Sequence, residues 1–96
     1  DGVRAARLIM ETEKTKGEII NIGSEEEVTI NKLAEMLFKV ADFYPKIETK
    51  DAPKGSVEKR CPDIGKLIKL TNYSPKTKLE EGLKKTFLWY KNNYKP

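Results

Sequence analysis

The segment from residue 24 to residue 43 constrains the fold most, because its apolar side chains recur at the spacing of a single helix face. Thr29 can cap this helix with its hydroxyl, and the three glutamates that precede Thr29 suit the positive end of the helix dipole. The predicted buried face consists of Ile30, Leu33, Ala34, Leu37, Val40 and Ala41. We therefore expect an amphipathic helix with one buried stripe.

Short runs rich in β-branched residues flank this helix. Residues 18–22 are bounded by glycines, and their length and composition favour a buried strand. Residues 46–50, after Pro45, alternate enough for a second strand with Ile47 and Thr49 on one face. A strand, a crossover helix and a strand form a βαβ unit, so the two strands are expected to lie parallel. A two-stranded sheet is barely stable alone and needs helices or a larger sheet beside it.

A further helix is expected at the start of the chain. It runs from Val3 to about Glu13 and is followed by Gly17, which supplies the left-handed conformation at which helices commonly end. Its predicted apolar stripe is formed by Val3, Ala6, Ile9 and Met10.

The last two helices are expected on either side of Asn72. Asp63 is the predicted N-cap of the earlier helix, and Asn72 is its predicted left-handed C-cap. Thr77 is the predicted N-cap of the final helix, with Glu80 three residues later as in a capping box. The predicted apolar faces are Ile64, Leu67 and Ile68 in the earlier helix and Leu79, Leu83, Phe87 and Tyr90 in the final one.

These elements follow the order αβαβαα, so the predicted fold class is α/β. We expect one small subdomain over residues 1–96, with two short parallel strands packed against helices. A chain of 96 residues buries a smaller fraction of its surface than a larger domain does, so we expect a thin core. The sequence starts at Asp1 without a methionine and already inside a predicted helix, so we expect a piece of a longer protein.

Composition argues against several classes of protein. The chain has 19 Lys and Arg against 15 Asp and Glu, but the charges are interspersed, and no recognition motif accompanies them, so we expect no nucleic-acid binding. No run of about 18 apolar residues occurs, so we expect no membrane association. One cysteine cannot form an intrachain disulfide, and without histidine a zinc site lacks ligands. The cytoplasm is the expected compartment.

The sequence offers no catalytic arrangement of its own. Without histidine, Ser-His-Asp and Cys-His sites cannot form within this chain. No glycine-rich turn of the GxGxxG or Walker type occurs, so we predict no catalytic, metal-binding or cofactor-binding residue. Cys61 is more consistent with a small, partly buried side chain than with a nucleophile. The helical spacing of Phe87, Trp89, Tyr90 and Tyr94 favours core and interface over a base-stacking platform.

A loop rich in proline and glycine carries the candidate binding residues. The loop around Gly55 contains Lys54, Lys59 and Arg60. Such a loop can bring ammonium and guanidinium groups to a diphosphate, and arginine can bind it through bidentate hydrogen bonds. On the residues alone, solvated loop cations with no ligand are the favoured interpretation.

Four sequence motifs add support to the interpretation that these loop cations bind a ligand. The sequence contains NIGS at residues 21–24, Asp63-Ile64, Pro75 and LEEGL at residues 79–83. In this order they resemble the C-terminal region of the extended short-chain dehydrogenases, the NAD-dependent nucleotide-sugar epimerases, dehydratases and decarboxylases. The form KRCPDI at residues 59–64 is most similar to the UDP-glucuronate decarboxylase branch. The resemblance covers nearly the whole chain.

The resemblance implies a two-part enzyme. An N-terminal dinucleotide-binding domain holds NAD and a Tyr-x-x-x-Lys catalytic pair, and the C-terminal part covers the nucleotide sugar. This chain resembles only the C-terminal part and lacks the Tyr-x-x-x-Lys pair. Its expected partners are a UDP- or dTDP-linked sugar and the missing N-terminal domain, and the parent enzyme is expected to be a homodimer. Whether this chain alone is an enzyme stays open, and we expect it to be inactive.

Departures from the family pattern bear on the binding site. In several branches the diphosphate-binding arginine stands at the position that Pro53 holds here. The resemblance therefore makes Arg60 the first candidate for the phosphate contact, with Lys59 and Lys54 behind it. The alternative function is a stand-alone basic interaction module that binds nucleic acid or a protein partner.

Overall fold

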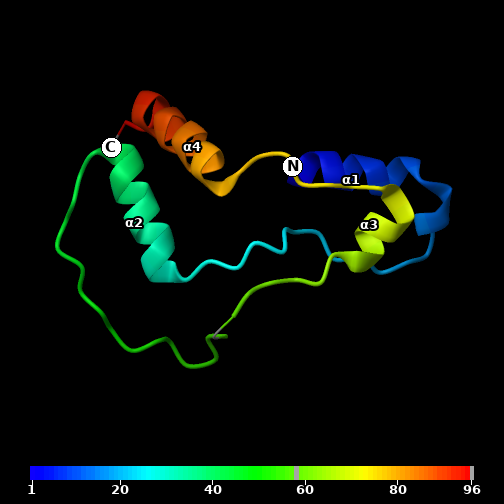
Figure 1. Ribbon diagram of the computed structural model, residues 1–96, viewed down its shortest axis with the longest axis horizontal. Helices are drawn as coiled ribbons and strands as arrows, with labels where there is room; N and C mark the ends of the chain where they lie inside the picture. The colour runs from blue at the N-terminus through cyan, green and yellow to red at the C-terminus, as the bar shows by residue number, and fades with distance from the viewer. Residues whose placement is uncertain (58, 96) are drawn as a thin grey trace. The chain divides into compact units, whose positions relative to one another are not determined.

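A computed structural model describes residues 1–57 and 59–95, and in these ranges the chain consists of helices joined by irregular segments (Figure 1). The α-helices are α1 (Gly2–Glu11), α2 (Ile30–Ala41), α3 (Gly65–Thr71) and α4 (Leu79–Asn93), and a short 3-10 helix, η1 (Glu13–Thr15), follows α1. The four predicted helices are thus present. Glu58 and Pro96, which belong to the predicted subdomain, lie outside the described residues.

The predicted α/β fold is wrong, because neither predicted strand forms in the described residues. Residues 18–22 and 46–50 are both irregular. β-Branched residues favour a strand when they pack on a half-buried pleated surface, but Ile19 is 89% exposed and Ile47 is also exposed. Without further strands to build a stable sheet, local propensity does not order these two segments.

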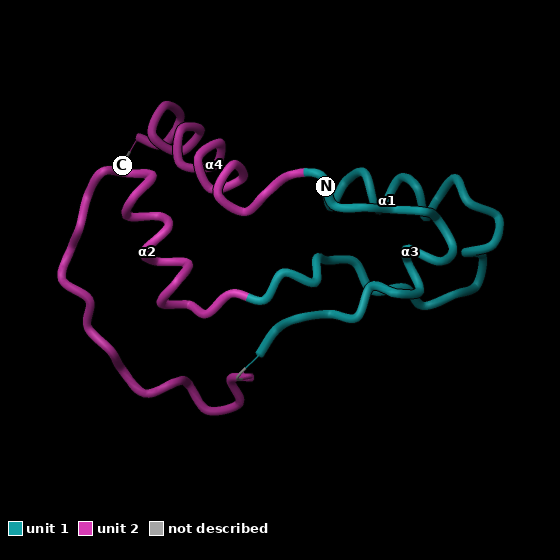
Figure 2. Tube along the Cα trace, viewed as in Figure 1, with its two compact units in different colours: residues 1–27, 58–76 teal, residues 28–57, 77–96 magenta. Residues whose placement is uncertain are grey.

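The chain divides into two compact units (Figure 2). The first contains residues 1–27 and 59–76, with α1, η1 and α3, and the second contains residues 28–57 and 77–95, with α2 and α4. Across the described part of the chain, no helix combines the length and apolar character that crossing a membrane requires.

The buried core lies in the first unit, where α1 packs against α3. Its buried apolar residues are Ala5, Ile64, Leu67 and Tyr73, with Leu8, Ile9 and Ile20 packed against them. The predicted stripe of α1 is confirmed at Ile9 only, because Ala6 is exposed and Val3 and Met10 are each 86% exposed. Helical spacing fits more than one face of this short segment, and the face that meets the core carries Ala5, Leu8 and Ile9.

Arg4 fixes the start of α1 to the segment that follows α3. Its guanidinium donates hydrogen bonds to the Ser74 carbonyl oxygen at 2.6 Å and to Asp1 Oδ1 at 3.2 Å, and lies 4.9 Å from the centroid of the Tyr73 ring. Asp1 Oδ2 accepts a hydrogen bond from the Lys76 backbone N–H at 3.2 Å. These contacts close the first unit around its small core.

The second unit is a pair of helices, α2 and α4, that pack against each other. The predicted cap of α2 is confirmed, because Thr29 Oγ1 accepts a hydrogen bond from the Lys32 backbone N–H at 3.1 Å. The helix faces that meet are only half-buried. Ile30 and Tyr90, which were predicted to be buried, are exposed, because two helices alone enclose little apolar surface.

The ends of α3 and α4 follow the sequence prediction only in part. Asn72 ends α3 in the left-handed conformation, with φ 55°, as predicted. Asp63 lies one residue before the N-cap position of α3, but its Oδ1 still accepts a hydrogen bond from the Gly65 N–H at 2.8 Å. The predicted cap at Thr77 is wrong, because Lys78 holds the N-cap position of α4.

Candidate functional site

Two sequence motifs meet in the first unit. Residues 21–27 and residues 59–63, which we call the paired loops, lie along each other in opposite directions (Figure 1). The contacts pair Asn21 with Asp63, Gly23 with Pro62, and Glu27 with Lys59. NIGS and KRCPDI, which carry much of the sequence resemblance, therefore form one local structure.

The middle contact of the paired loops requires a glycine. A Cβ atom at position 23 would stand 2.4 Å from Pro62 Cγ, which is closer than such atoms approach. Beside this contact, Asn21 Nδ2 donates a hydrogen bond to the Asp63 carbonyl oxygen at 3.4 Å. Asp63 also holds the start of α3, so the paired loops are anchored to the core of the first unit.

An ion pair closes one end of the paired loops. Lys59 Nζ lies 2.7 Å from Glu27 Oε1, and both side chains are more than half exposed. The hydrogen bond and the negative charge of Glu27 raise the pKa of Lys59 above its ordinary value. Beyond the other end, Lys66 forms an ion pair with Glu18. The sequence predicted Lys59 as a candidate binding residue but not its carboxylate partner.

Arg60 is exposed, and within the described residues its guanidinium forms no ion pair. Cys61 beside it is an exposed free thiol, so the expectation of partial burial is wrong. Lys54 belongs to the second unit, next to Gly55 in a turn closed by a hydrogen bond from the Ser56 N–H to the Pro53 carbonyl oxygen. Of the three candidates, Lys59 and Arg60 thus belong to one of the paired loops, and Lys54 does not.

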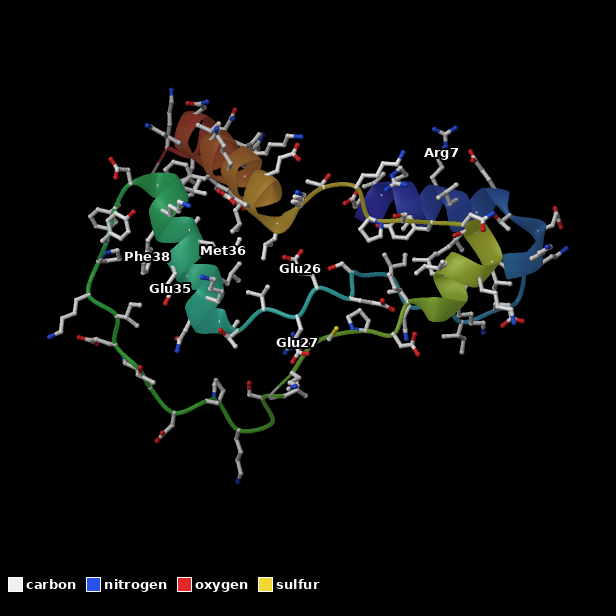
Figure 3. All side chains as sticks on the ribbon, viewed as in Figure 1. Arg7, Glu26, Glu27, Glu35, Met36 and Phe38 are labelled. Atoms are coloured by element: carbon white, nitrogen blue, oxygen red, sulfur yellow. The ribbon has the colours of Figure 1, made fainter. Side chains whose placement is uncertain are left out.

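The second unit contains an open pocket of about 410 Å³. Figure 3 labels two of its residues, Glu35 and Met36, on α2. The pocket is lined by Lys32, Glu35, Met36, Lys39, Tyr44 and Glu80. Lys32 Nζ lies 3.6 Å from Glu35 Oε2, so opposite charges compensate each other in this lining.

Aromatic residues gather on the last two turns of α4 and just beyond them. The ring centroids of Trp89 and Tyr90 lie 5.1 Å apart, edge to face, and those of Tyr90 and Tyr94 lie 6.4 Å apart. All three side chains are more than half exposed, so the prediction that they contribute to a core is wrong, while a role in an interface stays a prediction. In residues 1–57 and 59–95 no three metal-ligating side chains come together.

Curated proteins of known name match the chain over most of its length. UDP-N-acetyl-alpha-D-glucosaminuronate decarboxylase from Bacillus cytotoxicus is 36% identical over 95% of the chain. UDP-glucuronate 4-epimerase from Thermodesulfobacterium geofontis is 38% identical and GDP-L-fucose synthase 1 from Arabidopsis thaliana 37% identical, each over 79% of the chain. The chain spans 30%, 24% and 23% of these relatives' own lengths.

No protein-family model matches the chain, and no solved structure matches it. The three relatives are named for different reactions and match at nearly equal identity, so the decarboxylase branch stays a prediction. The family resemblance itself is confirmed. The chain is a distant homologue of the C-terminal portions of the NAD-dependent nucleotide-sugar epimerases and decarboxylases.

Proposed function

We propose that this chain is the nucleotide-sugar-binding C-terminal part of a cytoplasmic, homodimeric, NAD-dependent epimerase, dehydratase or decarboxylase. It covers the UDP- or dTDP-linked sugar while another domain carries out the redox chemistry. Closure of such a part over its ligand keeps water out of the reaction. The observation that carries the proposal is homology to proteins named for reactions of nucleotide sugars, over as much as 95% of the chain.

Arg60 is the proposed contact to the diphosphate. Its guanidinium is exposed and unpaired among the described residues, whereas the neighbouring ammonium of Lys59 is bound to Glu27. A planar guanidinium also matches two phosphate oxygens at once, which an ammonium cannot do. These features support Arg60 as the first ligand, with Lys59 second and Lys54 third.

The residues present do not fit a site for NAD. The chain has neither a glycine-rich dinucleotide fingerprint nor a Tyr-x-x-x-Lys pair. We therefore place NAD and the catalytic residues in the N-terminal domain of the parent enzyme, and we propose that this chain is inactive by itself.

The homology to proteins named for reactions of nucleotide sugars favours this function over a basic interaction module. Six of the 19 lysines and arginines have a carboxylate partner in the described residues, so ion pairing alone does not separate the two functions. A surface that binds nucleic acid needs cations that are available to phosphates, and its affinity falls steeply with salt. Binding of RNA or DNA by the chain with a steep salt dependence would instead support the basic module.

The test is kinetic and uses a full-length enzyme that carries this chain. Arg60→Ala is expected to raise KM for the nucleotide sugar by roughly 10- to 100-fold, since a charge-assisted hydrogen bond is lost. The kcat is expected to change less, because the diphosphate lies away from the reacting carbon and is bound alike in ground and transition states.

Two matched variants sharpen this test. Arg60→Lys keeps the charge but loses the two-pronged bond, so an intermediate KM is expected. Lys54→Ala is expected to have the smallest effect. Kinetics of Arg60→Ala equal to those of the unmodified enzyme would rule out Arg60 as the diphosphate ligand.

A further inference from the structure

We propose that Glu27 is an internal competitor of the ligand: its carboxylate occupies Lys59 until a diphosphate takes its place. This inference rests on the proposed function of the same site. It adds a regulatory role for an acidic residue that lies outside the predicted set of ligands. It also predicts that the chain binds phosphate more weakly than it would if Glu27 did not occupy Lys59.

The geometry of the paired loops brings the two residues together. The Gly23–Pro62 and Asn21–Asp63 contacts fix how residues 21–27 lie along residues 59–63. Glu27 is thereby held opposite Lys59, with Oε1 and Nζ 2.7 Å apart. Lys59 directly precedes Arg60, so Glu27 occupies the cation next in sequence to the one proposed to bind the diphosphate.

Glu27 differs from its neighbour Glu26 in forming an ion pair with Lys59. Figure 3 shows the two side chains leaving opposite sides of the backbone, with that of Glu27 directed toward the segment that carries Lys59. No ion pair of Glu26 occurs in the described residues. The two carboxylates carry the same charge at adjacent positions, so Glu26 is the matched control for a specific effect of Glu27.

The ion pair is weak enough to exchange. Both partners are exposed, and exposed ion pairs change an equilibrium constant by no more than roughly fivefold. A diphosphate carries more negative charge than one carboxylate, so it can displace Glu27 from Lys59. Removing the carboxylate should therefore tighten phosphate binding by roughly three- to fivefold.

The experiment measures UDP affinity by NMR titration of the isotope-labelled chain at 0.15 M salt, where distant charges are screened. The variants are Glu27→Gln, Glu26→Gln, Lys59→Gln, Arg60→Ala and the double variant Glu27→Gln/Lys59→Gln, each checked for unchanged circular dichroism. Glu27→Gln is expected to bind UDP about three- to fivefold more tightly, and Glu26→Gln to match the unmodified chain. This gain in UDP affinity should vanish in the Glu27→Gln/Lys59→Gln variant when it is compared with Lys59→Gln alone, which completes a double-mutant cycle.

The unmodified chain provides a second readout. When UDP is added, the carboxyl carbon of Glu27 is expected to shift because Lys59 leaves it, whereas that of Glu26 stays in place. Equal affinities of Glu27→Gln and Glu26→Gln, or a gain that persists without Lys59, would overturn the inference. If Arg60→Ala weakens UDP binding in that case, the proposed diphosphate contact is supported although the inference about Glu27 is overturned. If no variant binds UDP, the inference falls, and the diphosphate contact is decided by the kinetics of Arg60→Ala in the full-length enzyme.

Discussion

Gly23 and Pro62 lie in such close contact that a side chain at position 23 would force the paired loops to shift. A Cβ atom built on Gly23 would stand 2.4 Å from Pro62 Cγ. The proline ring is closed onto its own backbone, so it cannot swing away as a flexible side chain would. This one contact holds the glycine of NIGS against the proline of KRCPDI and so fixes the position of the cations that precede Pro62.

We expect Gly23→Ala to destabilise the first unit by about 1–3 kcal/mol, the usual cost of forcing an extra carbon into a packed contact. Urea unfolding followed by circular dichroism measures the loss. Gly2→Ala is the control, because a Cβ at position 2 meets nothing within 4 Å. Pro62→Ala should restore stability in the Gly23→Ala background, and a double variant as unstable as Gly23→Ala would show that the ring contact is not the cause.

The cap of α2 supplies a second prediction. Thr29→Ala removes the oxygen that accepts the Lys32 N–H and should cost about 1 kcal/mol. Hydrogen exchange of the first-turn amides of α2 should accelerate accordingly. Thr29→Ser retains the oxygen and should behave like the unmodified chain; equal loss in both variants would point to the methyl group rather than the cap.

Sequence reasoning succeeded where the cause is local. Thr29 caps α2 and Asn72 ends α3 because hydroxyl acceptance and tolerance of positive φ are properties of single residues. It failed for residues 18–22, because a strand needs partners whose presence no local pattern guarantees. The choice of buried face in α1 also failed, since several faces of a short helix satisfy the same spacing.

The candidate site, too, could be predicted only where the cause is local. That Lys59 and Arg60 are exposed cations could be predicted from their composition and loop position. Their surroundings could not, because Glu27 and Gly23 are distant in sequence and meet residues 59–63 only after the first unit has folded. The family motifs were the one signal that linked the two loops, and they indicated a common origin rather than a contact.

Asn72 tests the conformational cost of ending α3. Its φ of 55° is accessible to glycine and asparagine but costs an alanine about 1 kcal/mol. Asn72→Ala should therefore lower the urea midpoint, while Asn72→Gly should leave it close to that of the unmodified chain. A similar loss in both variants would mean that the asparagine side chain, and not the backbone angle, stabilises the end of the helix.

The ion pair between Glu81 and Lys85 on α4 predicts a dependence on pH. The hydrogen bond from Lys85 and its positive charge lower the pKa of Glu81, whose Oε1 lies 2.8 Å from Lys85 Nζ. A carboxyl group with a lowered folded-state pKa stabilises the fold above its unfolded pKa, and this contribution is lost as pH falls through the folded pKa. NMR titration should give Glu81 a midpoint below that of an isolated glutamate. Lys85→Gln should raise this midpoint, and an unchanged midpoint would contradict the assignment.

Leu67 tests how much the small core of the first unit contributes. It is a fully buried residue of α3 in the core that α3 shares with α1, so Leu67→Ala should cost about 2–5 kcal/mol through lost burial and the cavity that remains. Total stability of a small domain is of the same order, so the first unit should unfold at much lower urea concentration or lack protected amides altogether. Leu88→Ala on α4 is the matched control, because Leu88 is exposed and should lose far less. Equal losses at the two positions would show that the packing of α1 on α3 does not hold the first unit together.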